Sequence, residues 1–292
     1  MVLPLIYSSE SNISKEVSRI ALGLEYDGSA WEGWQSQPSG KTIQQSLEFA
    51  LEKIVGHPVR AHCAGRTDAG VHATHQVVHF DTPAIRPLSA WTRGVNTYLP
   101  KSIAVHWAKV VPESFHARFS ATGRRYRYIL LNRPQRPGLL NRKVGWFHRP
   151  LEIDAMREAA TYLLGEHDFS SFRSIQCQSK TPVKTLHLLA IQRSGDFYSF
   201  DFAANAFLHH MIRNIVGALI EVGSGKRSKS WMQEILNKRD RQSAAPTFDA
   251  AGLYFMGPAY PPHWGLPGLT QENFLRDNPP SEPNFLITPF NS

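Results

Sequence analysis

Cysteine is scarce in this chain of 292 residues, and several other sequence features are missing altogether. The two cysteines, Cys63 and Cys177, stand in no paired motif, which excludes a disulfide framework and a cysteine-based zinc site. The chain lacks any run of about 18 or more apolar residues, so it predicts no membrane-spanning helix. Neither a Walker loop nor a dinucleotide-binding glycine fingerprint occurs, so we expect no nucleotide cofactor. Together these absences favour a protein of the cytoplasm.

Acidic residues are in the minority. Against 32 Lys and Arg there are 24 Asp and Glu, which leaves a formal net charge of +8. This balance is typical of a protein that approaches a polyanion, although charge can also serve solubility alone. Apolar residues make up 42% of the chain and aromatic residues 11%, which is enough for a substantial core and indicates an ordered protein. The length allows one large domain or two moderate ones.

The periodicity of apolar residues predicts an α+β chain built from two similar units. The first unit has predicted strands over 20–26, 59–63, 75–80 and 103–107. Its main helix lies between a Thr42–Gln45 capping box and Gly56, and Ser89 is the expected cap of a short helix. In the second unit, strands are predicted over 124–131, 186–191, 197–202 and 252–256, and helices over 154–164, with Asp154 as N-cap, and 207–223. We divide the chain into an extension (1–18), two subdomains (19–115 and 116–262) and a tail (263–292).

The stretch from Gly65 to Ala73 carries the most specific pattern. It reads Gly-Arg-Thr-Asp-Ala-Gly-Val-His-Ala, which puts Asp68 on a connection between two predicted strands. An Asp beside Gly is often no more than turn chemistry, in which the side chain bonds its own backbone. A connection on a rigid scaffold is also where a protein presents a reactive carboxylate.

The complete string resembles the signature of the tRNA pseudouridine synthase A family. Three further segments resemble the same family: Tyr26-Asp27-Gly28 with Gly33-Trp34-Gln35, the segment 115–126, and the segment 205–214. The resemblance implies a pseudouridine-synthase fold, in which two α/β units share a mixed, mostly antiparallel sheet with packed helices and a central basic cleft. It implies a homodimer that isomerises uridine to pseudouridine at positions 38, 39 and 40 of the tRNA anticodon stem-loop. It asks for no cofactor and no metal.

The resemblance also implies roles for three residues. Asp68 would be the catalytic nucleophile or base, Arg213 would pair with it and keep it ionised, and Tyr126 would stack on the target uracil. The residues alone leave other interpretations open. Tyr126 faces away from Arg125 and Arg127 on its strand, and could be a core tyrosine. Arg213 lies four residues after His209 and could belong to a solvated helix face.

Basic residues in or near these segments are candidate contacts to RNA. They are Arg66, Arg124, Arg125, His209 and His210, and each could equally be a solvated surface charge. Arg66 could also fill the space that a flipped nucleotide leaves. The two tryptophans of segment 27–35 could stack on bases or close the end of a sheet. A non-catalytic RNA-binding module and a protein whose charge serves only solubility remain the alternative functions.

The histidines that follow Asp68 do not predict a metal site. Residues 75 and 79 share a strand face but would lie about 13 Å apart along an extended strand, too far for one ion.

Overall fold

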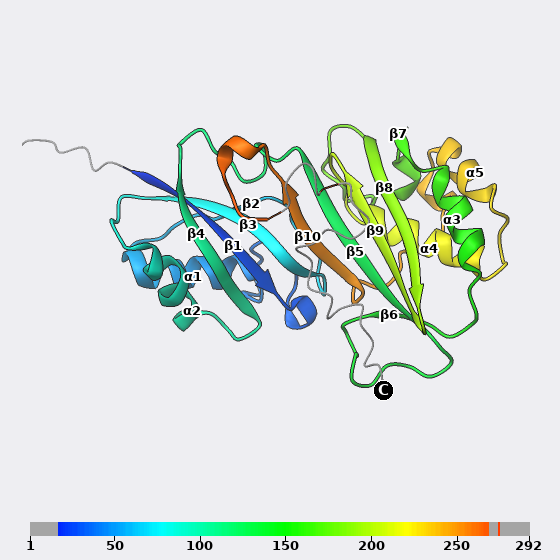
Figure 1. The fold of residues 1–292 in the computed structure, drawn as a ribbon, viewed down its shortest axis with the longest axis horizontal. Coiled ribbons are helices and arrows are strands. Elements are labelled where there is room, and N and C mark those ends of the chain that lie inside the picture. Colours follow the sequence, from blue (N-terminus) through cyan, green and yellow to red (C-terminus); the bar gives the residue numbers. More distant parts are fainter. Residues whose placement is uncertain (1–16, 269–273, 275–292) are drawn as a thin grey trace, which may run out of the picture.

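A single twisted sheet runs through the whole molecule (Figure 1). The structure is a computed structural model that describes residues 17–268 and Phe274. In this part of the chain the sheet has ten strands in the order β4-β1-β3-β10-β5-β9-β8-β7, with β2 paired to β3 and β6 paired to β5. No helix in the same residues is long and apolar enough to cross a membrane.

The first half of the sheet has helices at one end of the molecule (Figure 1). Its elements are β1 (Ser18–Tyr26), α1 (Ile43–Val55), β2 (His62–Cys63), β3 (His72–Thr82), α2 (Val95–Tyr98) and β4 (Ile103–Val111). The ends of α1 are confirmed, because the Thr42 side chain accepts from the Gln45 N–H and Gly56 ends the helix with φ 80°. Ser89 precedes a π-helical turn over 90–94 and makes no side-chain capping bond, so the predicted cap is wrong.

The second half places three helices at the opposite end. Its elements are β5 (Gly123–Asn132), β6 (Gly145–Phe147), α3 (Ile153–Thr161), β7 (Gly165–Asp168), β8 (Val183–Ser194), β9 (Phe197–Ala204), α4 (Met211–Gly223) and α5 (Trp231–Lys238). The predicted β8–β9 hairpin is confirmed. Asp154 lies in the first turn of α3, and Glu152 holds the N-cap position instead.

The last strand, β10 (Leu253–Ala259), joins the two halves. It runs parallel to β3, with Tyr254 opposite His72, and antiparallel to β5, with Phe255 opposite Tyr126. All other pairs except β5–β6 are antiparallel among the described strands, which confirms the expected mixed sheet. Ser18 begins β1 and so is not part of a loose extension. Residues 1–16 and most of the predicted tail lie outside the described residues.

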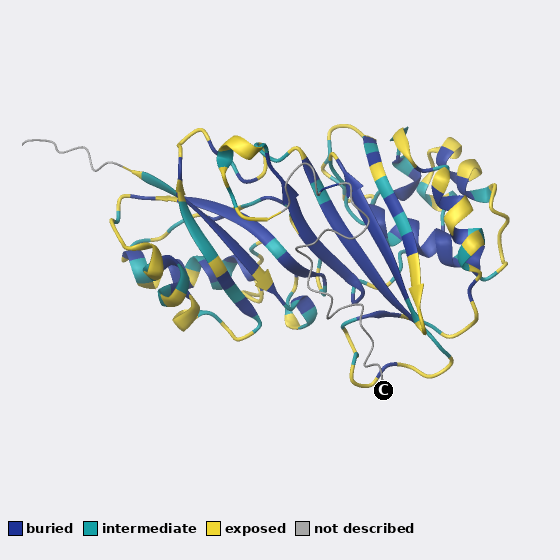
Figure 2. Ribbon diagram, viewed as in Figure 1, coloured by how far each residue is buried: buried dark blue, intermediate teal, exposed yellow. Residues whose placement is uncertain are grey.

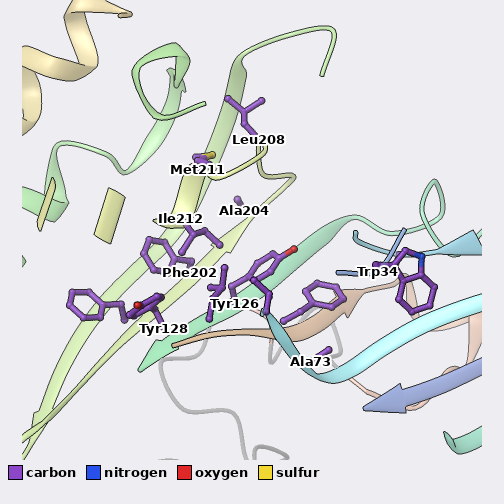
Figure 3. Packing of buried hydrophobic residues seen from close by; sticks show 14 of the residues in the cluster. Trp34, Ala73, Tyr126, Tyr128, Phe202, Ala204, Leu208, Met211 and Ile212 are labelled. Carbon is purple, nitrogen blue, oxygen red and sulfur yellow. The ribbon is translucent and has the colours of Figure 1, made fainter. Parts of the chain in front are cut away.

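The core is continuous across the junction. Figure 2 shows the central strands buried along most of their length, and Figure 3 shows how their side chains pack. Tyr126, Phe202 and Ile212 come from β5, β9 and α4 and belong to the same cluster as Trp34 and Ala73 of the first half. The two halves therefore form one packed body, with the site residues at their junction.

Candidate active site

The loop that carries Asp68 is fastened to two buried residues of β3, Gln76 and Val77. The Ala64 N–H donates to the Val77 carbonyl at 2.8 Å, and the Gln76 amide donates to the Gly65 carbonyl at 2.6 Å. Thr67 Oγ1 lies 2.8 Å from the Tyr26 hydroxyl. Our sequence analysis missed Gln76, a fully buried polar residue. Its strand also carries Thr74, His75 and His79, so the local sequence carries no signal that Gln76 is buried.

A second loop, over 27–35, holds Asp68 from the other side. The Trp34 N–H donates to the Thr67 carbonyl at 3.0 Å, and the Gly70 N–H donates to the Trp31 carbonyl at 3.2 Å. Gly33 has φ 92°, and a Cβ there would stand 2.7 Å from the Thr67 carbonyl oxygen. Only glycine permits both this backbone angle and this approach. Trp34 is buried, so of the two roles left open for the tryptophans, Trp34 closes the sheet.

Three side chains that can be cationic surround the Asp68 carboxylate. His209 Nε2 lies 3.1 Å from Oδ1, while His210 Nε2 and Arg213 Nη1 lie 3.4 Å and 3.3 Å from Oδ2. The Asp68 side chain is 23% exposed, so these charges act in a partly desolvated place. The structure thus brings together Asp68 and Arg213 as the resemblance implied, and adds both histidines.

This environment favours the anionic form of Asp68. Burial would raise the pKa of the carboxyl, but the hydrogen bond from His209 and the charges of His210, His209 and Arg213 outweigh it and lower the pKa below its ordinary value. The same hydrogen bond raises the pKa of His209. Burial lowers the pKa of His210, which makes it the less basic of the two histidines. Asp68 is therefore ready to act as a nucleophile or base.

The start of α4 sets this geometry. His210 precedes the helix with φ 64°, a backbone conformation that residues with a Cβ rarely adopt. The helix consequently begins at Met211 and not at 207, and His209 does not share a helix face with Arg213. Arg213 Nε donates to the Phe248 carbonyl at 2.8 Å, which directs the guanidinium towards Asp68. The backbone turn at His210 brings the two histidines to the same carboxylate.

Asp68, His209 and His210 also have the residue types of a metal site. Their ligand atoms lie within 4.8 Å of one another, which one cation could span. Arg213, however, already places a positive charge against the same carboxylate. We therefore interpret the histidines as partners of the carboxylate rather than as metal ligands.

Tyr126 lies at the centre of the sheet on the face that carries α4 (Figure 3). Its ring packs against Phe207 and Phe255, with centroids 5.1 Å and 4.9 Å away. Burial raises the pKa of the phenol, and the charge of Asp68 adds to that rise. The hydroxyl therefore keeps its proton. It lies close to the Asp68 loop, because a Cβ added to Gly65 would stand 3.6 Å from it.

The structure corrects the expectation that Arg125 contacts RNA. Its side chain is fully buried on the opposite face of the sheet from Tyr126, with Nη2 3.4 Å from Asp201 Oδ1. Arg127 Nε lies 2.9 Å from the same oxygen. Two arginines and one aspartate thus form a buried ionic group behind the site. The alternation of side chains along β5 predicted that Arg125 and Arg127 share one face of the sheet, but it could not show that this face is buried.

Arg124 and Arg66 lie at one end of the site. Arg124 donates to the carbonyls of Ala64, Ala121 and Asn205 at 3.2 to 3.4 Å and to that of Arg118, so it ties the Asp68 loop to β5 and β9. Its guanidinium is therefore largely committed to the fold. Arg66 is exposed beside Asp68 and is free to approach a ligand.

A cavity of about 620 Å³ lies at the other end, next to Ala69 and Gly70. Trp31, Trp146, Arg136 and Arg142 line it, together with the carboxylates of Glu32 and Asp249. Trp31, the other tryptophan of segment 27–35, thus faces this cavity beside the loop of Asp68.

Known proteins match this chain over most of its length. The family model described as "tRNA pseudouridine synthase" matches residues 24–120 and 159–261, which include Asp68 and the start of α4 but not Tyr126. The chain belongs to the tRNA pseudouridine synthase family. It is 60% identical to "tRNA pseudouridine synthase A" of Dechloromonas aromatica (strain RCB) over 249 residues, which cover 85% of this chain and 95% of that protein.

Other members of the family are similarly close. The protein of the same name from Aromatoleum aromaticum is 60% identical over 86% of this chain and 95% of its own length. That of Herminiimonas arsenicoxydans is 54% identical over 92% of this chain and 99% of its own length. A solved structure, "Crystal Structure of a Cbf5-Nop10-Gar1 Complex", matches with 12% identity and a TM-score of 0.33 over 87% of this chain and 53% of that chain. The family assignment therefore rests on the sequence matches.

Proposed function

We propose that this member of the tRNA pseudouridine synthase family isomerises uridine to pseudouridine at positions 38, 39 and 40 of the tRNA anticodon stem-loop, with Asp68 as its catalytic group. The observation that carries the proposal is the Asp68 carboxylate, held between His209 and Arg213 on the loop whose Gly65 lies near the Tyr126 hydroxyl. The reaction breaks the N1–C1′ bond of uridine and joins C5 to C1′, and the C5 hydrogen leaves as a proton. N1 takes up a proton in return, so uridine and pseudouridine have the same atoms. The reaction therefore requires neither an oxidant nor ATP.

The target uridine must first leave the base stack, at a cost of roughly a few kcal/mol. Arg66 is exposed two residues before Asp68 and is positioned to occupy the vacated space. Tyr126 then holds the uracil by stacking on it. In this structure Phe207 stands edge-on to the Tyr126 ring, so the uracil would enter beside Phe207.

Asp68 starts the reaction as an anion. It either attacks C1′ and forms an ester with the ribose, or removes the C2′ proton to give a glycal, and in both routes the N1–C1′ bonding electrons leave with the uracil. His209 and Arg213 keep the carboxylate ionised and oriented in either case. After the uracil rotates, C5 bonds to C1′ while the ester bond to Asp68 breaks or, in the glycal route, while C2′ regains its proton. C5 then loses its proton and N1 takes one up. The Tyr126 phenol oxygen can accept the C5 proton only by giving up its own, because burial keeps the phenol protonated.

We further propose that the enzyme works as a homodimer in the cytoplasm, as the family resemblance implies. Sedimentation velocity of the full chain tests the dimer, since a single species of about 33 kDa would contradict it.

The site selectivity is tested by treating unmodified tRNA with the enzyme and mapping pseudouridine by carbodiimide-dependent stops of reverse transcription. Stops at positions 38 to 40 support the proposal. Stops confined to other positions would retain the activity and reject the anticodon stem-loop as its target.

A further inference from the structure

Phe119 is exposed, whereas the two nearest apolar residues before it in the chain are buried. It exposes 75% of its surface, whereas Phe115 and Ala117, in the same short connection before β5, are fully buried. Single exposed apolar residues are common on protein surfaces and carry little meaning by themselves. Phe119 differs because neighbouring residues hold its ring in place and the Arg118 guanidinium lies beside it.

The turn at 116–120 is fixed by its own hydrogen bonds. His116 Nδ1 accepts from the backbone N–H groups of Arg118 and Phe119, at 3.1 Å and 3.3 Å. The Ser120 N–H donates to the His116 carbonyl at 2.9 Å. The imidazole of His116 also lies against the Phe119 ring, with centroids 4.3 Å apart. The aromatic ring is therefore preorganised and not a loose side chain.

One arginine lies beside this ring, and a second ties the turn to the loop of Asp68. The Arg118 guanidinium carbon lies 5.6 Å from the centroid of the Phe119 ring. Burial raises the pKa of the Cys63 thiol, and the charges of Arg66 and Arg118 both oppose that rise. Arg124 donates to the carbonyls of both Arg118 and Ala64, which joins the turn to the loop of Asp68. The ring thus stands beside the site at its Arg66 end.

We propose that Phe119 and Arg118 form a binding site for the substrate RNA, in which an unstacked base near the target uridine lies on the Phe119 ring and its phosphate pairs with Arg118. The choice of RNA as ligand rests on the proposed function. Aromatic rings accept any base face, and arginines at the edge of the ring neutralise the backbone that follows the base. The Arg118 guanidinium beside the ring suits a polyanion, whereas His116 is neutral, because its Nδ1 accepts two backbone N–H bonds.

Equilibrium binding of a labelled anticodon stem-loop RNA to the full-length protein tests the proposal. Phe119→Ala should raise Kd roughly 5- to 150-fold, the range of base–aromatic stacking, and Phe119→Trp should restore affinity. Arg118→Gln should weaken binding and reduce the slope of log K against log salt by about 0.7 to 0.9, whereas Phe119→Ala should leave that slope unchanged.

Two matched controls accompany these variants. Phe49→Ala removes a phenylalanine of α1 that is 53% exposed and has the Lys53 ammonium 4.9 Å from its ring. Arg227→Gln removes an arginine that lies 5.0 Å from the Trp231 ring, between α4 and α5. Both controls should bind RNA like the wild type.

Equal Kd values for Phe119→Ala and Phe49→Ala would overturn the proposal. A change of oligomeric state in Phe119→Ala, seen by sedimentation, would assign the ring to contact between copies of the chain instead. Pseudouridine formation is measured separately on the wild type. RNA binding that depends on Phe119 without any pseudouridine formation would keep this site and reject the proposed reaction.

Discussion

Replacing Arg213 by Gln should raise the pKa of Asp68 and slow the reaction, while the catalytic carboxylate itself stays in place. Arg213 Nη1 lies 3.3 Å from Asp68 Oδ2 and Nε lies 2.8 Å from the Phe248 carbonyl, so the substitution removes a charge and a fixed geometry together. A hydrogen bond to a charged group contributes about 1.5 to 3 kcal/mol. If it acts fully in the transition state, the rate constant should fall about 10- to 150-fold.

The direction in which the pH–rate profile shifts tests whether Arg213 controls the ionisation of Asp68. Asp68 acts as the anion, and Arg213 is one of the groups that lower its pKa. Removal of the guanidinium raises that pKa, so the acidic limb of the pH–rate profile should move to higher pH. Single-turnover rates on tRNA, measured across pH, test this, with Arg213→Lys as the control that keeps the charge but cannot reproduce both contacts. An unchanged acidic limb and a rate within twofold of the wild type would refute the role of Arg213.

Three further predictions concern the surroundings of Asp68. The pKa of His209 is raised by its bond to Asp68, so the stability that this bond adds is present below about pH 6.5 and is lost as pH rises through the raised value. Denaturant unfolding should therefore show the wild type exceeding His209→Gln at low pH and converging with it at high pH. Tyr126→Phe keeps the ring and should bind tRNA within about twofold of the wild type, whereas Tyr126→Leu should bind roughly 5- to 150-fold more weakly in the same titration. Asp201→Ala leaves two buried guanidinium groups without their shared carboxylate and should lower the free energy of unfolding by about 3 to 5 kcal/mol in urea, and a loss below about 1 kcal/mol would contradict the ionic role.

Local chemistry explains which elements could be predicted from the sequence. Both ends of α1 follow from Thr42 and Gly56, because a cap is a contact between residues a few positions apart. Asp68 and Arg213 were predicted to pair only through resemblance. They are far apart in sequence, and the structure brings them within 3.3 Å.

Tertiary contacts explain the errors. Phe207 and Leu208 continue the apolar stripe of α4, but the Ser174 N–H donates to the His209 carbonyl at 2.9 Å and fixes a turn there before the helix begins. Arg125 carries a charge in a basic segment, but its partner Asp201 lies on another strand, and no local pattern reveals that pairing. The parallel contact of β10 with β3 is equally non-local.

Tritium release from tRNA that carries 5-³H-uridine at positions 38 to 40 is the most direct test of the account, made with the wild type and with Asp68→Asn. Formation of the C5–C1′ bond expels the labelled hydrogen, and the amide can neither attack C1′ nor remove a proton as a carboxylate does. Release by the wild type alone is the predicted result. Release by both proteins would keep the reaction and remove Asp68 from its centre, and release by neither, with tRNA still bound, would contradict the proposed reaction.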